Sequence, residues 1–245
     1  MAIGVVAAMS AGSSCKQASG SGSDSGGDTA ADTAADTVAE ASALPGYERA
    51  YRALLSEAKQ CIGSGAEGSA AVEGIVSAAA GKTPEEALQA LGYAITDVSG
   101  DSIPELIIGA VAKNPHTAVV GNELYAVYAY ADGRARLILS GNARNPYYMR
   151  QYGDFIHEGS EGAGCSFFGI YMLDSTATQV TCIDFSFTSY EADGVTQAVY
   201  FNESSVCDVA ASTRSGLTVD EYWNMVSEQE GVTQLVELTP LADLK

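Results

Sequence analysis

The chain runs Asp97-Val-Ser-Gly-Asp-Ser-Ile-Pro-Glu-Leu-Ile-Ile-Gly109 between two apolar segments, residues 93–96 and 106–111. The apolar segments predict two strands, and the Gly-containing loop between them carries oxygen-bearing side chains at alternate positions. Ca²⁺ is bound by about six to eight such oxygens in irregular geometry. We therefore predict a Ca²⁺ loop with ligands from the side chains of Asp97, Ser99, Asp101 and Glu105 and from the backbone carbonyl of Ile103.

The loop resembles the D-x-[DN]-G-D-G-x-x-[DE] calcium loops of dockerins and FG-GAP repeats. It is more similar to the D-I-N-G-D-G-I-P-E-L-I-I-G segment of uncharacterised lipoproteins secreted by gut bacteria, over roughly residues 93–241, and this resemblance implies no particular activity. Ser99 stands where these loops have Asn or Asp, and Ser102 stands where they have a second Gly. Both departures weaken the predicted site. The alternative interpretation is a solvated acidic turn between two strands.

Acidic residues outnumber basic ones by 31 to 12, which gives a formal net charge of −19. Such a charge repels nucleic acids and anionic lipid headgroups, so the sequence disfavours DNA or RNA as a partner. Cations and basic partners remain compatible with it. With 245 residues, of which 47 % are hydrophobic, the chain is long enough to bury a substantial core.

Residues 1–14 are small and apolar and end at Cys15. This resembles the end of a bacterial lipoprotein signal peptide, which implies that residues 1–14 are its remnant and that Cys15 carries lipid. The protein would then be exported and anchored to the outer face of the bacterial cell membrane. No Lys or Arg precedes the apolar run, although a secretory signal needs a positive n-region, so we expect a start upstream of Met1. The alternative is a cytosolic chain with an Ala-rich start.

Residues 15–45 are predicted to be a disordered acidic tether. They consist mostly of Ser, Gly, Ala, Asp and Thr, with a tandem Asp-Thr-Ala-Ala pattern from Asp28. Such a segment has almost nothing large to bury, and its carboxylates keep it extended. About thirty such residues reach on the order of 30 Å on average.

Residues 46–245 are predicted to form a single globular domain of the α+β class. Apolar spacing predicts a helix over residues 47–62 and a weaker one over 72–79. Capping boxes predict helices that begin at Thr83, with Gly92 as the terminator, and at Thr218. Residues 232–238 read as a final apolar strand.

Between these helices the chain predicts antiparallel strands joined by short turns. Asp132-Gly133 is the strongest hairpin signal, and similar turns follow at residues 153–154, 174–175 and 193–194. The predicted architecture is therefore N-terminal helices packed on a mainly antiparallel β meander, with a C-terminal helix. The meander would be either a curled sheet or a small open barrel.

Four cysteines besides Cys15 fit a disulfide-permissive exported protein. Three pairings are compatible with them, and we favour Cys165–Cys182, which flank one predicted hairpin, over pairings with Cys61 or Cys207. The absence of a C-x-x-C motif gives little support to zinc or thioredoxin-type chemistry. The alternative is buried free thiols.

The sequence contains few groups arranged for catalysis. His157 lies near Asp154 and Ser160, but neighbours on one hairpin rarely form a triad. His116 falls in a predicted loop, and no two carboxylates are fixed at the separation that glycoside hydrolysis requires. The Gly-rich run 158–164 predicts a flexible hairpin connection with a glycine bulge, since its two Glu would repel phosphate.

The leading hypothesis is a lipid-anchored extracytoplasmic binding or interaction module with a structural calcium loop. Tyrosines of the predicted strands could present an aromatic surface to a carbohydrate or peptide, or could be ordinary strand packing; they are Tyr125, Tyr128, Tyr130, Tyr147, Tyr148 and Tyr152. One alternative is a secreted hydrolase with a carboxylate-based or His157-based site. Another is a structural envelope lipoprotein.

Overall fold

The computed structural model describes residues 44–117, 119–150 and 153–245. The signal-peptide remnant, the lipid-bearing Cys15 and nearly all of the tether therefore lie outside the described residues. Contacts group residues 44–245 into one compact unit. None of the helices in the described ranges is long and apolar enough to cross a bilayer.

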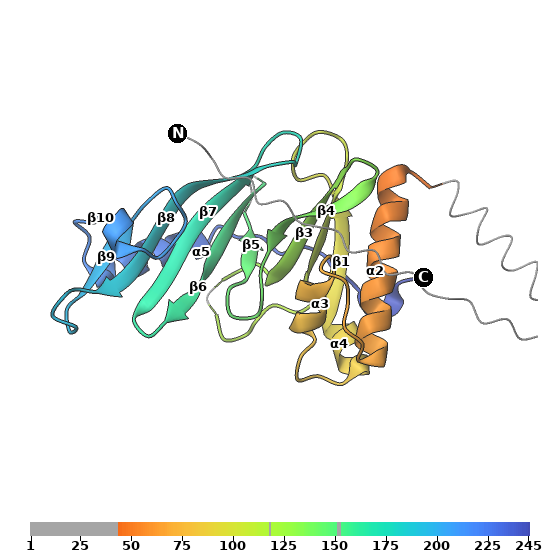
Figure 1. Ribbon diagram of the computed structural model, residues 1–245, viewed down its shortest axis with the longest axis horizontal. Coiled ribbons are helices and arrows are strands. Elements are labelled where there is room, and N and C mark those ends of the chain that lie inside the picture. The colour runs from red at the N-terminus through yellow and green to blue at the C-terminus, as the bar shows by residue number, and fades with distance from the viewer. Residues whose placement is uncertain (1–43, 118, 151–152) are drawn as a thin grey trace, which may run out of the picture. The chain divides into compact units, whose positions relative to one another are not determined.

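Four α-helices occur in the described ranges (Figure 1). They are α2 (Gly46–Ser64), α3 (Glu73–Ala78), α4 (Pro84–Ala90) and α5 (Val219–Glu230), with short 3-10 turns η1 (Val209–Ala211) and η2 (Leu241–Asp243). Both predicted capping boxes are present: the Thr83 and Thr218 hydroxyls accept from the backbone N–H groups of Glu86 and Glu221. These bonds satisfy donors that the first turn of a helix leaves unpaired.

The strands form one open sheet of 11 strands that does not close, so the predicted α+β fold with a mainly antiparallel meander is confirmed. Its order is β10-β9-β8-β7-β6-β5-β3-β2-β1-β11, with β4 paired to β3 off this path, and neighbouring strands in this order pair antiparallel. The strands are β1 (Leu91–Thr96), β2 (Glu105–Ala110), β3 (Leu124–Ala131), β4 (Arg134–Ser140), β5 (Tyr147–Met149), β6 (Asp154–Gly162), β7 (Cys165–Leu173), β8 (Val180–Tyr190), β9 (Gln197–Phe201), β10 (Thr213–Arg214) and β11 (Thr239–Pro240).

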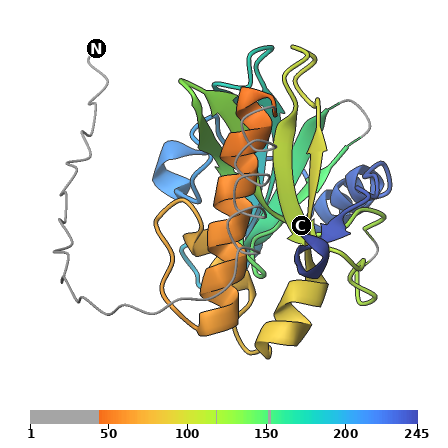
Figure 2. The same ribbon diagram turned by 90° about the vertical axis from the view of Figure 1, so that its right-hand side faces the viewer.

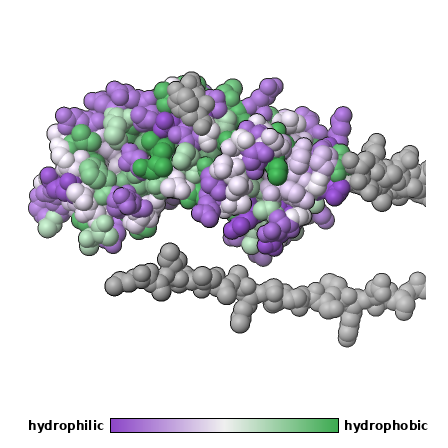
Figure 3. All heavy atoms as spheres, turned by 90° about the horizontal axis from the view of Figure 1, so that it is seen from above, coloured by the Kyte–Doolittle hydropathy of each residue, from purple (hydrophilic) through white to green (hydrophobic). Residues whose placement is uncertain are grey.

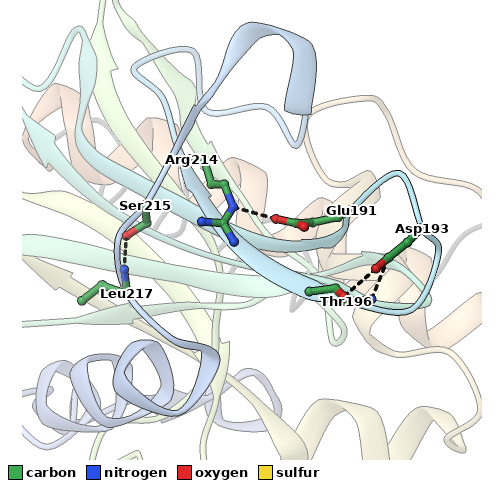
Figure 4. A network of polar contacts seen from close by, with 6 residues as sticks. All are labelled: Glu191, Asp193, Thr196, Arg214, Ser215 and Leu217. Carbon is green, nitrogen blue, oxygen red and sulfur yellow. Dashed lines mark hydrogen bonds and ion pairs between the residues drawn. The ribbon is translucent and has the colours of Figure 1, made fainter.

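The predicted hairpins join consecutive strands. Asp132 and Gly133 both have positive φ, 53° and 77°, the backbone that a two-residue turn between β3 and β4 requires. At the β8–β9 turn, the Asp193 carboxylate accepts from the backbone and hydroxyl of Thr196 (Figure 4). Beside it, Arg214 of β10 contacts Glu191 at 2.6 Å, so an ion pair links the edge strand to this turn.

Helices cover both sides of the sheet: Figure 2 shows α2 on one side and α5 on the other. One core cluster packs α2, α3 and α4 against β2 and β3 through Tyr51, Leu55, Ile75, Leu106 and Tyr128, all nearly inaccessible. A second joins β2, β3 and β4 to β5, β6 and β7, and a third packs Tyr222 and Val226 of α5 against Ile156 and Phe168. Burial of these apolar side chains holds α5 on the sheet beside β6.

The outer surface has no uniform character on the face that Figure 3 shows, where hydrophobic and hydrophilic residues interleave. Among the exposed apolar side chains, Ile183 of β8 and Phe201 of β9 are 53 % and 42 % accessible. Scattered exposed apolar residues of this kind are ordinary on soluble folds.

Two local predictions near the end and the start of the sheet are wrong. Residues 232–238 form no strand, because the Asn122 side chain exchanges two hydrogen bonds with the backbone of Val236 and replaces a ladder partner. β11 follows instead and pairs with β1. Gly92 does not end a helix: α4 stops at Ala90, and Gly92 lies in β1, where a Cβ would come 2.8 Å from the Thr239 carbonyl oxygen.

Candidate functional site

Glu105 anchors the predicted Ca²⁺ loop. It begins β2, is only 1 % exposed, and accepts from the backbone N–H groups of Val98 at 2.7 Å and Ser99 at 3.1 Å through Oε2. Its Oε1 accepts from the Ser99 hydroxyl at 3.2 Å. Burial raises the pKa of the Glu105 carboxyl, the three donors oppose that rise, and the nearby Asp101 charge adds to it.

The other loop carboxylates accept hydrogen bonds from the loop's own amides. Asp97 accepts from Gly100 at 2.7 Å and from Ser102 at 3.0 Å, and Asp101 accepts from Ile103 at 2.6 Å. Ser102 has φ 73°, a left-handed conformation that Gly adopts without strain and Ser does not. The departure from Gly that the sequence shows at this position therefore has a backbone cost.

The loop is also fixed to α2. The Tyr51 hydroxyl, at the end of a fully buried side chain, donates to the Pro104 carbonyl at 2.9 Å. Burial raises the pKa of Tyr51, and the Glu105 and Asp101 charges raise it further, so this phenol stays protonated and remains a donor. The acidic loop thus packs against the helical layer through a neutral hydroxyl.

The donor chemistry of the loop fits Ca²⁺, because its side-chain ligands are carboxylate and hydroxyl oxygens. A carboxylate oxygen that accepts one N–H keeps a second lone pair, so Asp97 and Glu105 retain capacity for a cation. In the described part of the chain, however, Asp97, Asp101 and Glu105 do not bring three ligand oxygens within 4.8 Å of one another. The Ca²⁺ site, with Ser99 and Ile103 as further ligands, stays a prediction.

A second group of acids lines a hollow of about 340 Å³ beside α5, which we call the acidic pocket. Its acids come from three elements: Glu123 precedes β3, Glu158 lies in β6, and Glu230 ends α5. Trp223 and Tyr148 supply aromatic surface in the same pocket, and Arg144 also lines it.

The periodicities of two elements bring Glu158 and Glu230 together. Glu158 lies two residues after Ile156 in β6, on the same strand face, which packs against α5. Glu230 follows Tyr222 and Val226 at intervals of four residues, on the helix face that contacts the sheet. Each glutamate therefore extends an apolar packing face by one polar position. Glu123 is held separately, since its oxygens accept from Asn114 and the Tyr125 hydroxyl, both at 2.7 Å.

The surroundings in the acidic pocket raise the pKa values of two of its side chains, Glu158 and Tyr148. Burial raises the pKa of Glu158 to about 7, and the charge and hydrogen bond of the adjacent Glu230 raise it as well, whereas the Tyr148 hydroxyl opposes the rise. The pKa of Tyr148 is raised by burial and then by Glu158 and Glu123. Near neutral pH, part of the Glu158 carboxyl population is therefore protonated, and a cation could displace that proton.

Sequence reasoning missed this pocket because it interpreted residues 158–164 as a hairpin connection. The predicted glycine bulge is present, as a register shift between Ser160 and Gly162, but Glu158 itself lies within β6. Packing requires a glycine at position 159, because a Cβ there would come 2.1 Å from Asn145 Oδ1. The sequence feature that could have indicated the pocket is a glutamate at a core-facing position in each of two elements, Glu158 in β6 and Glu230 in α5.

His157 is a buried aromatic neighbour and not part of a triad. Its ring stacks on Tyr147 at 4.0 Å, and burial lowers its pKa to about 4, so it is neutral near pH 7. Asp154 lies 3.3 Å from Arg150 in an ion pair, and the Ser160 hydroxyl donates to backbone carbonyls. Asp154 and Ser160 thus contact partners other than His157, and His116 is exposed in its loop.

The tyrosines of the strands mostly pack inside the fold. Tyr125, Tyr128, Tyr147 and Tyr148 are each 7 % exposed or less, and Tyr152 lies outside the described residues. Ordinary strand packing therefore describes these four residues, and of them only Tyr148 also lines the acidic pocket. Trp223, which is 44 % exposed, presents more aromatic surface than any of these four.

The favoured disulfide is wrong. The described cysteines are all free, and Cys165 pairs across the ladder with Gly162, whereas Cys182 pairs with Tyr171. Tyr171 lies six residues beyond Cys165 along β7, a displacement of about 20 Å. The sequence predicted that the two cysteines lie in one hairpin, but it did not predict the register between β7 and β8 that separates them.

Scans of the chain against protein-family models, curated proteins and solved structures found no match.

Proposed function

We propose that this chain is an extracytoplasmic binding module whose acidic pocket takes the ammonium or guanidinium group of a basic peptide side chain. The observation that supports it is the convergence of Glu123, Glu158 and Glu230 with Trp223 and Tyr148 in one hollow. Carboxylates and an accessible indole face both attract a cation. The net charge of −19 favours approach of basic partners.

The cellular address in this proposal comes from the N-terminal sequence. The lipoprotein resemblance of residues 1–15 and the acidic composition of the tether support a lipid anchor at Cys15, with the domain outside the cell membrane. A ligand would then reach the pocket from the extracellular side. The calcium loop would serve stability and would not contact the ligand.

Binding can be measured through intrinsic fluorescence, because Trp223 is the one tryptophan of the chain and lines the pocket. Short peptides that contain Lys should change its emission on titration, and otherwise identical peptides with norleucine should not. Glu158→Gln and Glu230→Gln should each weaken binding about 10- to 100-fold, as expected when a charge-assisted hydrogen bond is lost. High salt should weaken binding to the wild type as well.

The matched control is Glu228→Gln, which removes the same charge from an exposed position of α5. It should leave the affinity for the Lys peptide within about twofold, since exposed charges are screened. Equal affinity of Lys and norleucine peptides, or wild-type affinity in both pocket variants, would contradict a cationic ligand.

A hydrolase is the second candidate, and one observation favours it: Glu158, with its pKa raised to about 7, lies beside a second carboxyl group. A protonated acid next to a carboxylate is the combination that general acid–base hydrolysis uses. The same titrations distinguish the two functions. If a peptide or glycan probe is cleaved, and Glu158→Gln abolishes cleavage while the probe still binds, the pocket is catalytic.

The calcium loop predicts a separate stability effect. A site of this composition should bind Ca²⁺ with a dissociation constant of about 10⁻⁴ M. At about 1 mM Ca²⁺ the unfolding free energy should rise by roughly 1.4 kcal/mol, a melting shift of about 3–6 °C for a domain of this size. Calorimetry with Ca²⁺ against chelator measures it. Asp97→Asn or Asp101→Asn should abolish the shift, and Glu85→Gln should preserve it. If the melting temperature of the wild type does not change with Ca²⁺, the loop is only an acidic turn.

A further inference from the structure

A third cluster of side chains lies apart from the loop and the acidic pocket, where the β6–β7 turn meets the loop between β9 and β10. The ligand atoms of Glu161, Cys165 and Cys207 all lie within 4.8 Å of one another. Glu161 is exposed and the two cysteines are half-buried, so the cluster is reachable from solvent. Three potential metal ligands thus converge from segments more than forty residues apart in the chain.

The backbone on both sides of this cluster is held in place. The Ser160 hydroxyl donates to the carbonyls of Gly162 and Cys165, both at 2.9 Å, which fixes the turn that carries Glu161 and Cys165. Across from it, the Val206 carbonyl accepts from the Asn202 side chain at 2.7 Å and from the Asp208 backbone at 2.8 Å. These two bonds constrain the loop immediately before and after Cys207.

We propose that Glu161, Cys165 and Cys207 form a binding site for a thiophilic divalent cation of the Zn²⁺ class. Zn²⁺ binds thiolate sulfur at about 2.3 Å and carboxylate oxygen at about 2.0–2.2 Å, so tetrahedral ligand atoms lie roughly 3.5–3.8 Å apart. The limit of 4.8 Å that encloses the three ligand atoms lies about 1 Å above that spacing, a difference that side-chain rotation can close. Three protein ligands leave a fourth position for water, as in exchangeable or catalytic zinc sites.

The charge balance favours a cation at this place. Binding releases one proton from each thiol, and the resulting two thiolates and one carboxylate carry three negative charges, of which Zn²⁺ neutralises two. Because a thiol must lose its proton to bind the metal, affinity for the metal should increase with pH.

An oxidant could join Cys165 and Cys207 only after their side chains move closer together, and that outcome is distinguishable. A Cys165–Cys207 disulfide would consume both thiols and leave Glu161 without a role. The convergence of a carboxylate with both sulfurs favours the metal site, because a disulfide gains nothing from an adjacent carboxylate.

The test is a titration of the full chain, reduced and freed of metal by chelator, with Co²⁺ as the spectroscopic probe and Zn²⁺ as the competitor. One equivalent of Co²⁺ should produce a thiolate-to-cobalt charge-transfer band that Zn²⁺ removes. Cys165→Ser and Cys207→Ser should each abolish the band, and Glu161→Gln should weaken binding at least about tenfold. Cys15→Ser and Cys61→Ser should leave both the band and the affinity unchanged.

Three outcomes would overturn the proposal. The first is a reduced wild type without the band, and the second is a band that survives both Cys165→Ser and Cys207→Ser. The third is protein from the native cell envelope, prepared without reductant, in which peptide mapping finds Cys165 joined to Cys207. Glu161 is exposed, so Glu161→Gln should not disturb folding and keeps the test informative if a cysteine variant unfolds.

Discussion

Glu158→Gln should raise the melting temperature by roughly 4–12 °C at about pH 8 and by much less at about pH 5. The folded-state pKa of Glu158 is raised from the ordinary 4.5 to about 7. A raised pKa contributes stability that is fully present below the unfolded value and is lost as pH rises through the folded value. At about 1.36 kcal/mol per unit, and with allowance for partial exposure, the loss is about 2–3 kcal/mol.

The side-chain amide of the Glu158→Gln variant is neutral at every pH and similar in shape to the carboxyl group, so the variant escapes this loss. Wild-type stability should therefore fall as pH rises from about 4.5 to about 7, and the variant's curve should stay flatter over that window. Thermal melts of both proteins across this range measure the difference, with about 2–4 °C expected per kcal/mol for a domain of this size.

Glu228→Gln is the matched control for this prediction, because it removes one charge from the exposed side of the same helix that carries Glu230. Its stability should differ from that of the wild type by no more than about 0.5 kcal/mol at every pH. Parallel pH curves for Glu158→Gln and the wild type would show that the Glu158 carboxyl titrates normally. The pocket would then lose the electrostatic feature on which the hydrolase candidate depends.

Glu105→Ala should lower the unfolding free energy by about 3–4 kcal/mol, measured in chelator so that a bound cation contributes nothing. Removal of the carboxylate leaves the backbone N–H groups of Val98 and Ser99 and the Ser99 hydroxyl without their acceptor at a position only 1 % exposed. Each buried donor left unpaired costs about 1–3 kcal/mol. Chemical denaturation measures the loss directly.

Two companion variants separate the causes of this loss. Glu105→Gln keeps one acceptor oxygen at the same place and should cost only about half as much. Asp101→Ala removes a half-buried carboxylate that accepts one amide bond, from Ile103, and should cost about 1 kcal/mol or less. If Glu105→Ala were no more costly than Asp101→Ala, Glu105 would not be the structural anchor of the loop.

Local sequence signals determined the elements of this fold. The capping boxes at Thr83 and Thr218 and the Asp132-Gly133 turn act through bonds between residues at most a few positions apart, so they can be recognised without any knowledge of the rest of the chain. The same holds for the position of the acidic loop between β1 and β2. These signals were sufficient for the α+β class and the antiparallel meander.

Tertiary structure alone decided how distant segments meet. Residues 232–238 are rich in apolar side chains, which predicted a strand. The Asn122 side chain instead makes the two hydrogen bonds to the Val236 backbone that a neighbouring strand would have made. Glu158 and Glu230 meet because an apolar face of β6 packs against an apolar face of α5, far along the chain. Cys165 meets Cys207 and not Cys182, because the sheet register separates Cys165 from Cys182. Such encounters depend on packing and register over long separations, which no local pattern of residues encodes.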